Sequence, residues 1–287
     1  MKKIKLDAYG KINLGLDVLG KRDDGYHDLD MIMQSVDLAD KITITKNDSG
    51  EITVKSNTGK IPNDESNLAY KAAKLLIDEF EIEDGVQIEI EKNIPISGGM
   101  AGGSTDCATV LKGMNKLFKL KLSEQDLMDR GVKLGADVPF CVMGKTARAQ
   151  GIGEVLTPIP NKLKGYIVLA KPPISVSTGF VYGRIDEVEV ENKPDTEAMI
   201  EAIKNNDLET LSKTICNVLE EVTIPDYPIV QEIKDKMMAH GALNSMMTGS
   251  GPTVFGLYDD KKKAIETVDA LKELGILEQL YLAKFVN

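Results

Sequence analysis

The chain has few of the residues that build disulfide frameworks and histidine-rich metal centres. Its 287 residues include only two histidines and three scattered cysteines, Cys107, Cys141 and Cys216. An odd number of cysteines without close pairs argues against a disulfide framework or a zinc cluster, so we expect buried free thiols. Two histidines also exclude a metal site that needs several imidazole ligands.

Long apolar runs and excess positive charge are also missing. No run of about 18 apolar residues occurs, so no transmembrane helix is predicted. Residues 1–20 begin with lysines but lack the apolar centre of a signal peptide, and we therefore expect a cytoplasmic protein. The net charge of −10 argues against nucleic-acid or anionic-membrane partners, because both need a basic surface. An acidic protein that binds phosphates must do so in a local, preorganised pocket.

Length and composition favour two globular domains. The chain exceeds the usual size of one domain, about 150 residues, and its 42% hydrophobic and 28% charged residues are ordinary for a protein with a core. A composition break over residues 157–165 (TPIPNKLKG) is the best candidate boundary. We predict an N-terminal ATP-binding domain over residues 1–160 and a C-terminal domain over residues 161–287.

Hydrophobic periodicity predicts a mixed α+β fold. Alternation predicts strands over residues 11–18, 31–46, 51–55, 86–90, 166–172 and 277–286, with a strand–glycine turn–strand around residue 250. Helical spacing predicts helices over residues 66–80, 195–222, 228–240 and 261–274, one directly after residue 106, and one starting at Ser123. Ser123 and Asp126 resemble a capping box. In the first strand, Lys11 and Asn13 should point the same way.

The strongest local signal is the glycine loop, which we define as Pro95–Asp106 (PISGGMAGGSTD). Its four glycines allow positive φ and a close approach of the backbone to a ligand. It lies between a predicted strand and the N-terminus of a predicted helix, where N–H groups and the dipole attract anions. Ser104, Thr105 and Asp106 are plausible capping residues, and either hydroxyl could reach a phosphate or a metal-bound water. The alternative is a strand–helix turn whose small residues serve packing.

This loop differs from the common phosphate-binding loops. A Walker A loop needs a lysine after its last glycine, where this chain has Ser104. A protein kinase needs His-Arg-Asp and Asp-Phe-Gly motifs, and neither is present. A dinucleotide-binding fold places its glycines after the first strand, whereas these follow several elements. Elimination leaves a separate class of phosphate loop.

Three motifs in order give the chain a resemblance to the GHMP kinase superfamily. They are AYGKINLGLDVLGKRDDGYH at residues 8–27, the glycine loop, and TGSGPTVFGLY at residues 248–258. The likeness spans nearly the whole chain and is strongest for the branch that acts on 4-diphosphocytidyl-2-C-methyl-D-erythritol. It implies a domain like the second domain of ribosomal protein S5, followed by a ferredoxin-like domain, with the active site in the cleft between them. The superfamily usually has glycine where Ala101 stands, so we expect altered loop geometry there without lost function.

The resemblance implies phosphorylation of the 2-hydroxyl of that alcohol by ATP, with Mg²⁺. Asp137, in GADVPF, would orient the hydroxyl and accept its proton, and Lys11 would keep Asp137 ionised and stabilise the developing charge. Without the resemblance, a solvated strand lysine and a turn-capping carboxylate are the simpler interpretations. Tyr26 would stack on cytosine while His27 reads its edge.

The binding residues expected on these grounds form three groups. For ATP they are Asn67, Pro95, Ile96, Ser97, Gly98, Gly99, Met100, Ala101, Gly102, Gly103, Ser104, Thr105 and Asp106. For the alcohol they are Asn13, Tyr26, His27, Thr178, Tyr182, Gly249, Ser250 and Gly251. Ser104 is also the expected metal ligand. Simple N-capping would explain Asn67 as well, and a plain hairpin would explain residues 249–251.

Two other functions remain open from the sequence. One is a homoserine or mevalonate-type kinase, against which the Tyr26–His27 pair argues, because those acceptors have no base to stack on. The other is a non-catalytic nucleotide-binding regulator, against which Lys11 and Asp137 argue. In each case we expect a small-molecule ligand, no nucleic acid or membrane partner, and a monomer or homodimer.

Overall fold

The computed structural model describes residues 2–287 and divides into two compact units. Unit 1 contains the residues up to 10, 38–96 and 101–144, and unit 2 contains residues 11–37, 97–100 and 145–287. Both units are discontinuous in sequence because the long strands β1 (Lys3–Lys21) and β2 (His27–Asn47) and the glycine loop each contribute to both. The domain boundary near residue 160 stays a prediction.

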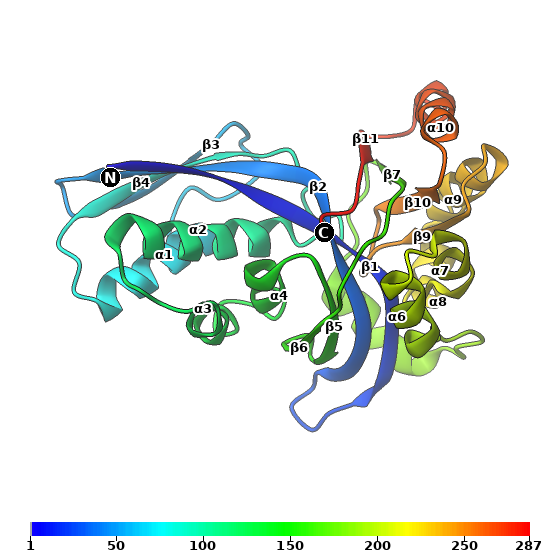
Figure 1. Cartoon of the computed structure of the whole chain (residues 1–287), viewed down its shortest axis with the longest axis horizontal. Helices are drawn as coiled ribbons and strands as arrows, with labels where there is room; N and C mark the ends of the chain where they lie inside the picture. Colours follow the sequence, from blue (N-terminus) through cyan, green and yellow to red (C-terminus); the bar gives the residue numbers. More distant parts are fainter. Residues whose placement is uncertain (1) are drawn as a thin grey trace. The chain divides into compact units, whose positions relative to one another are not determined.

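Unit 1 packs helices against a small sheet. The second half of β2 pairs antiparallel with β4 (Gly85–Glu91), which pairs parallel with β3 (Ile52–Ser56). This register places Ile42 opposite Ile90 and Ile44 opposite Ile88, and all four side chains are buried. Figure 1 shows α1 (Leu68–Glu79) and α2 (Gly102–Phe118) side by side next to these strands. The predicted strands and both helices are confirmed.

Capping side chains mark where two helices of unit 1 begin. The Asn67 side chain accepts a hydrogen bond from the Ala69 amide and begins α1. Ser123 and Asp126 form the predicted capping box at the start of α3 (Glu124–Gly131). The short helix α4 (Val138–Met143) was not predicted. Within residues 2–287, no helix has the length and apolar character needed to cross a membrane.

Unit 2 contains two groups of paired strands. The first half of β2 pairs with β5 (Thr146–Gly151), β5 with β6 (Val155–Pro158), and β1 with the short parallel strand β8 (Cys216–Asn217). A separate antiparallel sheet has the order β11 (Gln279–Ala283), β7 (Tyr166–Lys171), β10 (Val254–Tyr258), β9 (Asn244–Met247). Helices α9 (Ile229–Ala239) and α10 (Lys261–Glu273) contact it. The strands predicted over residues 166–172 and 277–286 and around residue 250 are confirmed as members of this sheet.

The prediction of one helix over residues 195–222 is wrong. This region contains α6 (Thr196–Lys204), α7 (Leu208–Thr214), β8 and the start of α8 (Glu220–Asp226). Asn206 adopts a left-handed φ of 56°, which asparagine tolerates better than most residues. Asp207 then caps α7 by accepting from the Thr210 amide. The apolar spacing continues across this break, so periodicity alone does not reveal it.

Candidate active site

Parts of all three motifs meet inside unit 2. The Lys11 amide of β1 donates to the Met100 carbonyl of the glycine loop at 3.2 Å. The Asn13 amide donates to Thr248 Oγ1 at 3.0 Å, and that hydroxyl lies 3.4 Å from the Gly99 carbonyl. Three segments that are far apart in the sequence are therefore joined by hydrogen bonds around Asn13 and Thr248.

Lys11 and Asn13 share one face of β1, as predicted. Lys11 is 5% exposed, and its Nζ donates to Asn13 Oδ1 at 2.7 Å. Asn13 is fully buried. The interpretation of Lys11 as a solvated strand lysine is thus wrong. A buried ammonium needs polar partners because its desolvation is unfavourable, and the Asn13 amide oxygen supplies one.

The turn Gly249–Gly251 joins β9 to β10 and is held by other segments of unit 2. Asn217 Nδ2 donates to the carbonyls of Met247 and Gly249, both at 2.8 Å. The hydroxyls of Thr178 and Ser250, two predicted substrate residues, are 3.0 Å apart. Asn217 is almost fully buried and was not found from the sequence, where a lone asparagine in a helical pattern carries no signal. The turn is braced more firmly than a simple hairpin requires.

A largely buried carboxylate also supports this turn. Glu220 Oε1 accepts from the Met247 amide at 2.7 Å, and Oε2 accepts from Lys234 Nζ at 2.6 Å. Burial raises the pKa of Glu220, although Lys234 opposes the shift. The Thr223 hydroxyl donates to the Ser250 carbonyl at 3.3 Å from the same helix, α8. Thus α8 holds both Met247, at the end of β9, and Ser250, within the turn.

His27 lies among residues suited to recognise a flat polar ring. It is 5% exposed, and its ring centroid lies 5.6 Å from that of Tyr182 in α5 (Thr178–Arg184). His27 Nε2 lies 3.0 Å from Asp186 Oδ1 in η1 (Ile185–Glu187). The neighbouring Tyr26 is 60% exposed. The structure therefore brings His27 and Tyr182 together, as expected. It also adds Asp186, which is 159 residues from His27 and which no sequence pattern indicated.

The backbone of the glycine loop differs from the expected one. Positive φ occurs at Ser97 (52°), Gly99 (75°) and Ala101 (55°), whereas the other three glycines of the loop do not adopt it. Of the four glycines, which were expected to allow positive φ, only Gly99 adopts it. Ala101 does occupy a left-handed position, at a typical cost of about 1–2 kcal/mol for a residue with Cβ. A Cβ on Gly99 would lie 2.1 Å from the Thr248 carbonyl oxygen, so close approach also requires glycine there.

The prediction that Ser104, Thr105 or Asp106 caps the following helix is wrong. Helix α2 begins at Gly102, and its N-cap residue is Ala101, which has no capping side chain. Thr105 is buried, and its hydroxyl donates to the Tyr9 carbonyl at 2.7 Å. Since no side chain caps α2, its first backbone amides can orient towards an anion.

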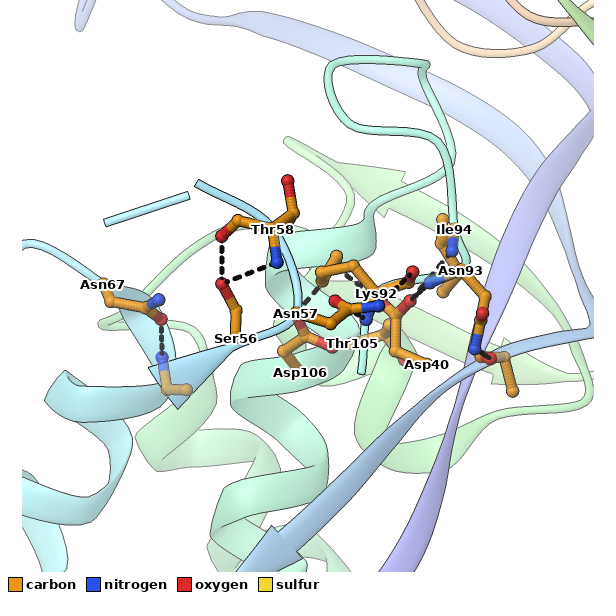
Figure 2. A network of polar contacts seen from close by, with 12 residues as sticks. Asp40, Ser56, Asn57, Thr58, Asn67, Lys92, Asn93, Ile94, Thr105 and Asp106 are labelled. Atoms are coloured by element: carbon orange, nitrogen blue, oxygen red, sulfur yellow. Dashed lines mark hydrogen bonds and ion pairs between the residues drawn. The ribbon is translucent and has the colours of Figure 1, made fainter. Parts of the chain in front are cut away.

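Asp106 belongs to a buried ionic cluster in unit 1 that Figure 2 shows. Lys92 Nζ donates to Asp40 Oδ2 at 2.5 Å and to Asp106 Oδ2 at 2.8 Å. Burial raises the pKa of Asp106 to about 8, and the attraction of Lys92 only partly offsets it. Burial lowers the pKa of Lys92, but the attraction of Asp106 and Asp40 outweighs burial and the net direction is upwards. Neither Lys92 nor Asp40 was found from the sequence.

Asn67 and Asp137, the other predicted residues of unit 1, both precede helices. The Asn67 side chain uses Oδ1 to cap α1 and donates from Nδ2 to the Pro62 carbonyl at 2.7 Å. Asp137 is half-buried immediately before α4, and its carboxylate makes no capping hydrogen bond to that helix. The capping interpretation therefore explains Asn67, whereas Asp137 does not cap α4. Across residues 2–287, no group of three or more His, Cys, Asp or Glu side chains could hold a metal ion.

Comparisons with known proteins agree with this arrangement. The family model for the GHMP kinases N terminal domain matches residues 67–145, and that for the GHMP kinases C terminal matches residues 199–277. A 4-diphosphocytidyl-2-C-methyl-D-erythritol kinase from Lachnospira eligens is 47% identical over 281 residues, covering 98% of each chain.

Solved structures give the same result. A crystal structure of 4-(cytidine 5'-diphospho)-2C-methyl-D-erythritol kinase superposes with a TM-score of 0.83 at 30% identity, covering 99% of this chain and 100% of that one. A homoserine kinase from Cytophaga hutchinsonii superposes with a TM-score of 0.78 at 17% identity, covering 99% and 95%. The second likeness extends to the fold alone.

Proposed function

Because this chain belongs to the GHMP kinases, and within them to the 4-diphosphocytidyl-2-C-methyl-D-erythritol kinases, we propose that it phosphorylates the 2-hydroxyl of that alcohol with ATP. This reaction is a step of the non-mevalonate route to isoprenoid precursors. The observation that carries the proposal is the near-full-length likeness to such kinases, together with the hydrogen bonds that join the three motifs around Asn13 and Thr248.

The chemistry requires an in-line attack on the γ-phosphorus. The 2-hydroxyl oxygen forms the new P–O bond, the bond to the β–γ bridging oxygen breaks, and ADP leaves. We assign acceptance or orientation of the hydroxyl proton to Asp137 and stabilisation of the developing charge to Lys11. Support for Lys11 comes from its burial and its hydrogen bond to Asn13. Asp137 is assigned on the near-full-length likeness to such kinases.

The metal is proposed to enter with the nucleotide, as the Mg²⁺ complex of ATP. Mg²⁺ commonly keeps several waters and is held by substrate phosphates with only one or two protein ligands. The lack of a three-residue acidic or histidine cluster in the described part of the chain fits such a metal better than a resident one. We assign the protein contact to the Ser104 hydroxyl, which lies in the first turn of α2.

Recognition of the cytosine is assigned to His27, Tyr26 and Tyr182. The Tyr26 side chain is exposed, so its ring is accessible for stacking, while His27 is held between Tyr182 and Asp186. Stacking of a base on an aromatic ring contributes about 1–3 kcal/mol. The Tyr26→Ala variant should therefore raise the KM for the cytidyl alcohol by roughly 5- to 150-fold and leave the KM for ATP nearly unchanged.

The test of this function is ADP release by the purified protein with ATP and a panel of alcohols. We expect turnover of 4-diphosphocytidyl-2-C-methyl-D-erythritol with MgCl₂ and its loss with excess EDTA. Turnover of homoserine or mevalonate without turnover of the cytidyl alcohol would refute the substrate assignment. Binding of ATP without any phosphoryl transfer would instead support a nucleotide-binding regulator.

Two variants test the catalytic roles against matched controls. Lys11→Ala and Asp137→Asn should each lower kcat by at least two orders of magnitude while ATP still binds. Lys5→Ala, an exposed lysine on the same strand, and Asp129→Asn, an exposed aspartate of α3, should keep normal rates. Normal rates in both catalytic-site variants would contradict the assigned roles.

A further inference from the structure

The charged side chains of Lys92, Asp40 and Asp106 form a cluster that is almost completely shielded from solvent. The side chains of Lys92, Asp40 and Asp106 are 5%, 0% and 4% exposed. One ammonium lies between two carboxylates from different elements, the second half of β2 and the second turn of α2. Buried ion pairs seldom add net stability over apolar packing, so their presence often reflects another requirement.

Asp40 fixes the chain just before the glycine loop. Its Oδ1 accepts from the backbone amides of Asn93 and Ile94 at 2.6 and 2.8 Å, as Figure 2 shows. Its Oδ2 accepts from Lys92 Nζ. A single carboxylate thus holds three consecutive residues that lead directly into Pro95.

Lys92 then reaches the other end of the loop. A Cβ on Gly102 would lie 3.2 Å from Lys92 Nζ and 3.3 Å from Ile94 Cγ2, so the ammonium packs close to the backbone of the first residue of α2. Lys92 also donates to Asp106 in the second turn of the same helix. Helix α2 has no capping side chain, and this cluster ties its second turn to the residues that follow β4, in addition to the hydrogen bond from Thr105 to Tyr9.

We propose that Lys92 is a positioning residue for ATP. Through Asp40 and Asp106 it holds the first turn of α2 in the orientation in which its backbone amides bind the triphosphate. This inference rests on the proposed function. Lys92 acts through the carboxylates and does not itself bind phosphate, because its ammonium is almost fully buried and already donates to both of them.

Asp106→Ala is the decisive variant because positioning and simple charge predict opposite signs. It breaks the link from Lys92 to α2 and leaves the Lys92–Asp40 ion pair in place. The titrations are made at about pH 9, above the pKa of about 8 of Asp106, where its carboxylate is ionised and removal of its charge near an anion site would by itself strengthen binding of ATP. If the link positions the helix, binding should instead weaken by at least tenfold. Asp106→Asn keeps an acceptor for Lys92 and should stay within threefold of the unmodified protein.

The measurement is calorimetric titration with a non-hydrolysable ATP analogue, combined with separate KM values for ATP and the cytidyl alcohol and a thermal melt. Asp106→Ala should raise the analogue Kd and the KM for ATP, with the KM for the alcohol within twofold. Lys92→Met leaves two carboxylates without a cation and should lower the melting temperature strongly. Where it folds, its effect and that of Asp106→Ala should not add. Lys41→Met, which removes the exposed ion pair of Lys41 in β2 with Asp7 in β1, is the control and should bind the analogue normally.

Each outcome supports or overturns the inference. Analogue binding by Asp106→Ala that equals or exceeds the unmodified protein would overturn it, as would equal weakening in Asp106→Asn and Asp106→Ala. A folded Lys92→Met variant with normal analogue binding would overturn it too. If the unmodified protein neither bound the analogue nor phosphorylated the cytidyl alcohol, the proposed function would be the part that failed.

Discussion

Replacing Gly99 with alanine should destabilise the protein strongly, because two independent effects act at this residue. Its φ of 75° lies in the left-handed region, where a Cβ costs about 1–2 kcal/mol. The new Cβ would also lie 2.1 Å from the Thr248 carbonyl oxygen and 3.3 Å from the Gly251 amide nitrogen. These are backbone atoms that no side-chain rotation can remove, and forced overpacking of this kind costs about 1–3 kcal/mol. The sum is about 2–5 kcal/mol.

The assay is urea unfolding followed by circular dichroism, with Gly103→Ala as the matched control in the same loop. Gly103 lies in the first turn of α2, and a Cβ added there would have Leu68 Cδ1 as its nearest neighbour, at 3.8 Å. Alanine is favoured over glycine in a helix by about 0.5–1 kcal/mol, so this control should be neutral or stabilising in the unfolding experiment. A Gly99→Ala variant within about 0.5 kcal/mol of the unmodified protein would refute the contact between the second and third motifs.

Three further predictions concern other residues. Ala101→Gly should raise the free energy of unfolding by up to about 1 kcal/mol in the same assay, because relief of the left-handed strain exceeds the added chain entropy of glycine; a destabilised variant would contradict this. Asp186→Asn should raise the KM for the cytidyl alcohol by roughly 5- to 30-fold with little change for ATP, because His27 loses a charged partner; parallel changes in both KM values would argue for a merely structural role. Burial raises the pKa of Glu220 above its unfolded value of 4.5, so its stabilising contribution is complete below that pH and is lost as pH rises through the folded pKa. The unfolding free energy of the unmodified protein, measured against Glu220→Gln from about pH 4.5 to 8, should therefore fall with pH, and a constant or rising difference would show that the carboxylate is not destabilised by burial.

Local chemistry was enough to predict much of the fold. The Ser123–Asp126 capping box, the Asn67 cap and the shared face of Lys11 and Asn13 all depend on residues within four positions of each other. Such patterns depend only on residues within one helical turn or one strand, so they can be recognised without knowledge of the tertiary structure. The family resemblance supplied roles for Lys11 and Asp137, which local patterns alone would have assigned to solvent and to a turn.

The ionic cluster could not be predicted because its meaning depends on strand register. In an alternating strand, a charged residue such as Lys92 or Asp40 is normally expected to face solvent. Here Lys41 of β2 pairs with Glu91, the last residue of β4, and this register brings Asp40 next to Lys92, which follows β4. A shift of one residue would send these side chains to opposite faces. The cluster is thus a property of the sheet and not of either strand.

The glycines of the loop show why a motif can be located from sequence and still be misread. Left-handed φ falls on Ser97 and Ala101 as well as on Gly99, so dihedral freedom does not explain where glycine is placed. Close approach does, because the Thr248 carbonyl lies against Gly99 and the Lys92 ammonium lies against Gly102. Thr248 is 149 residues away from Gly99, and nothing in the loop itself specifies that contact. Glycine is required at Gly99 because a backbone carbonyl packs against it, and at Gly102 the packing of Lys92 and Ile94 leaves little room for a Cβ. The loop's conformation therefore follows from the tertiary structure, although its position follows from the sequence.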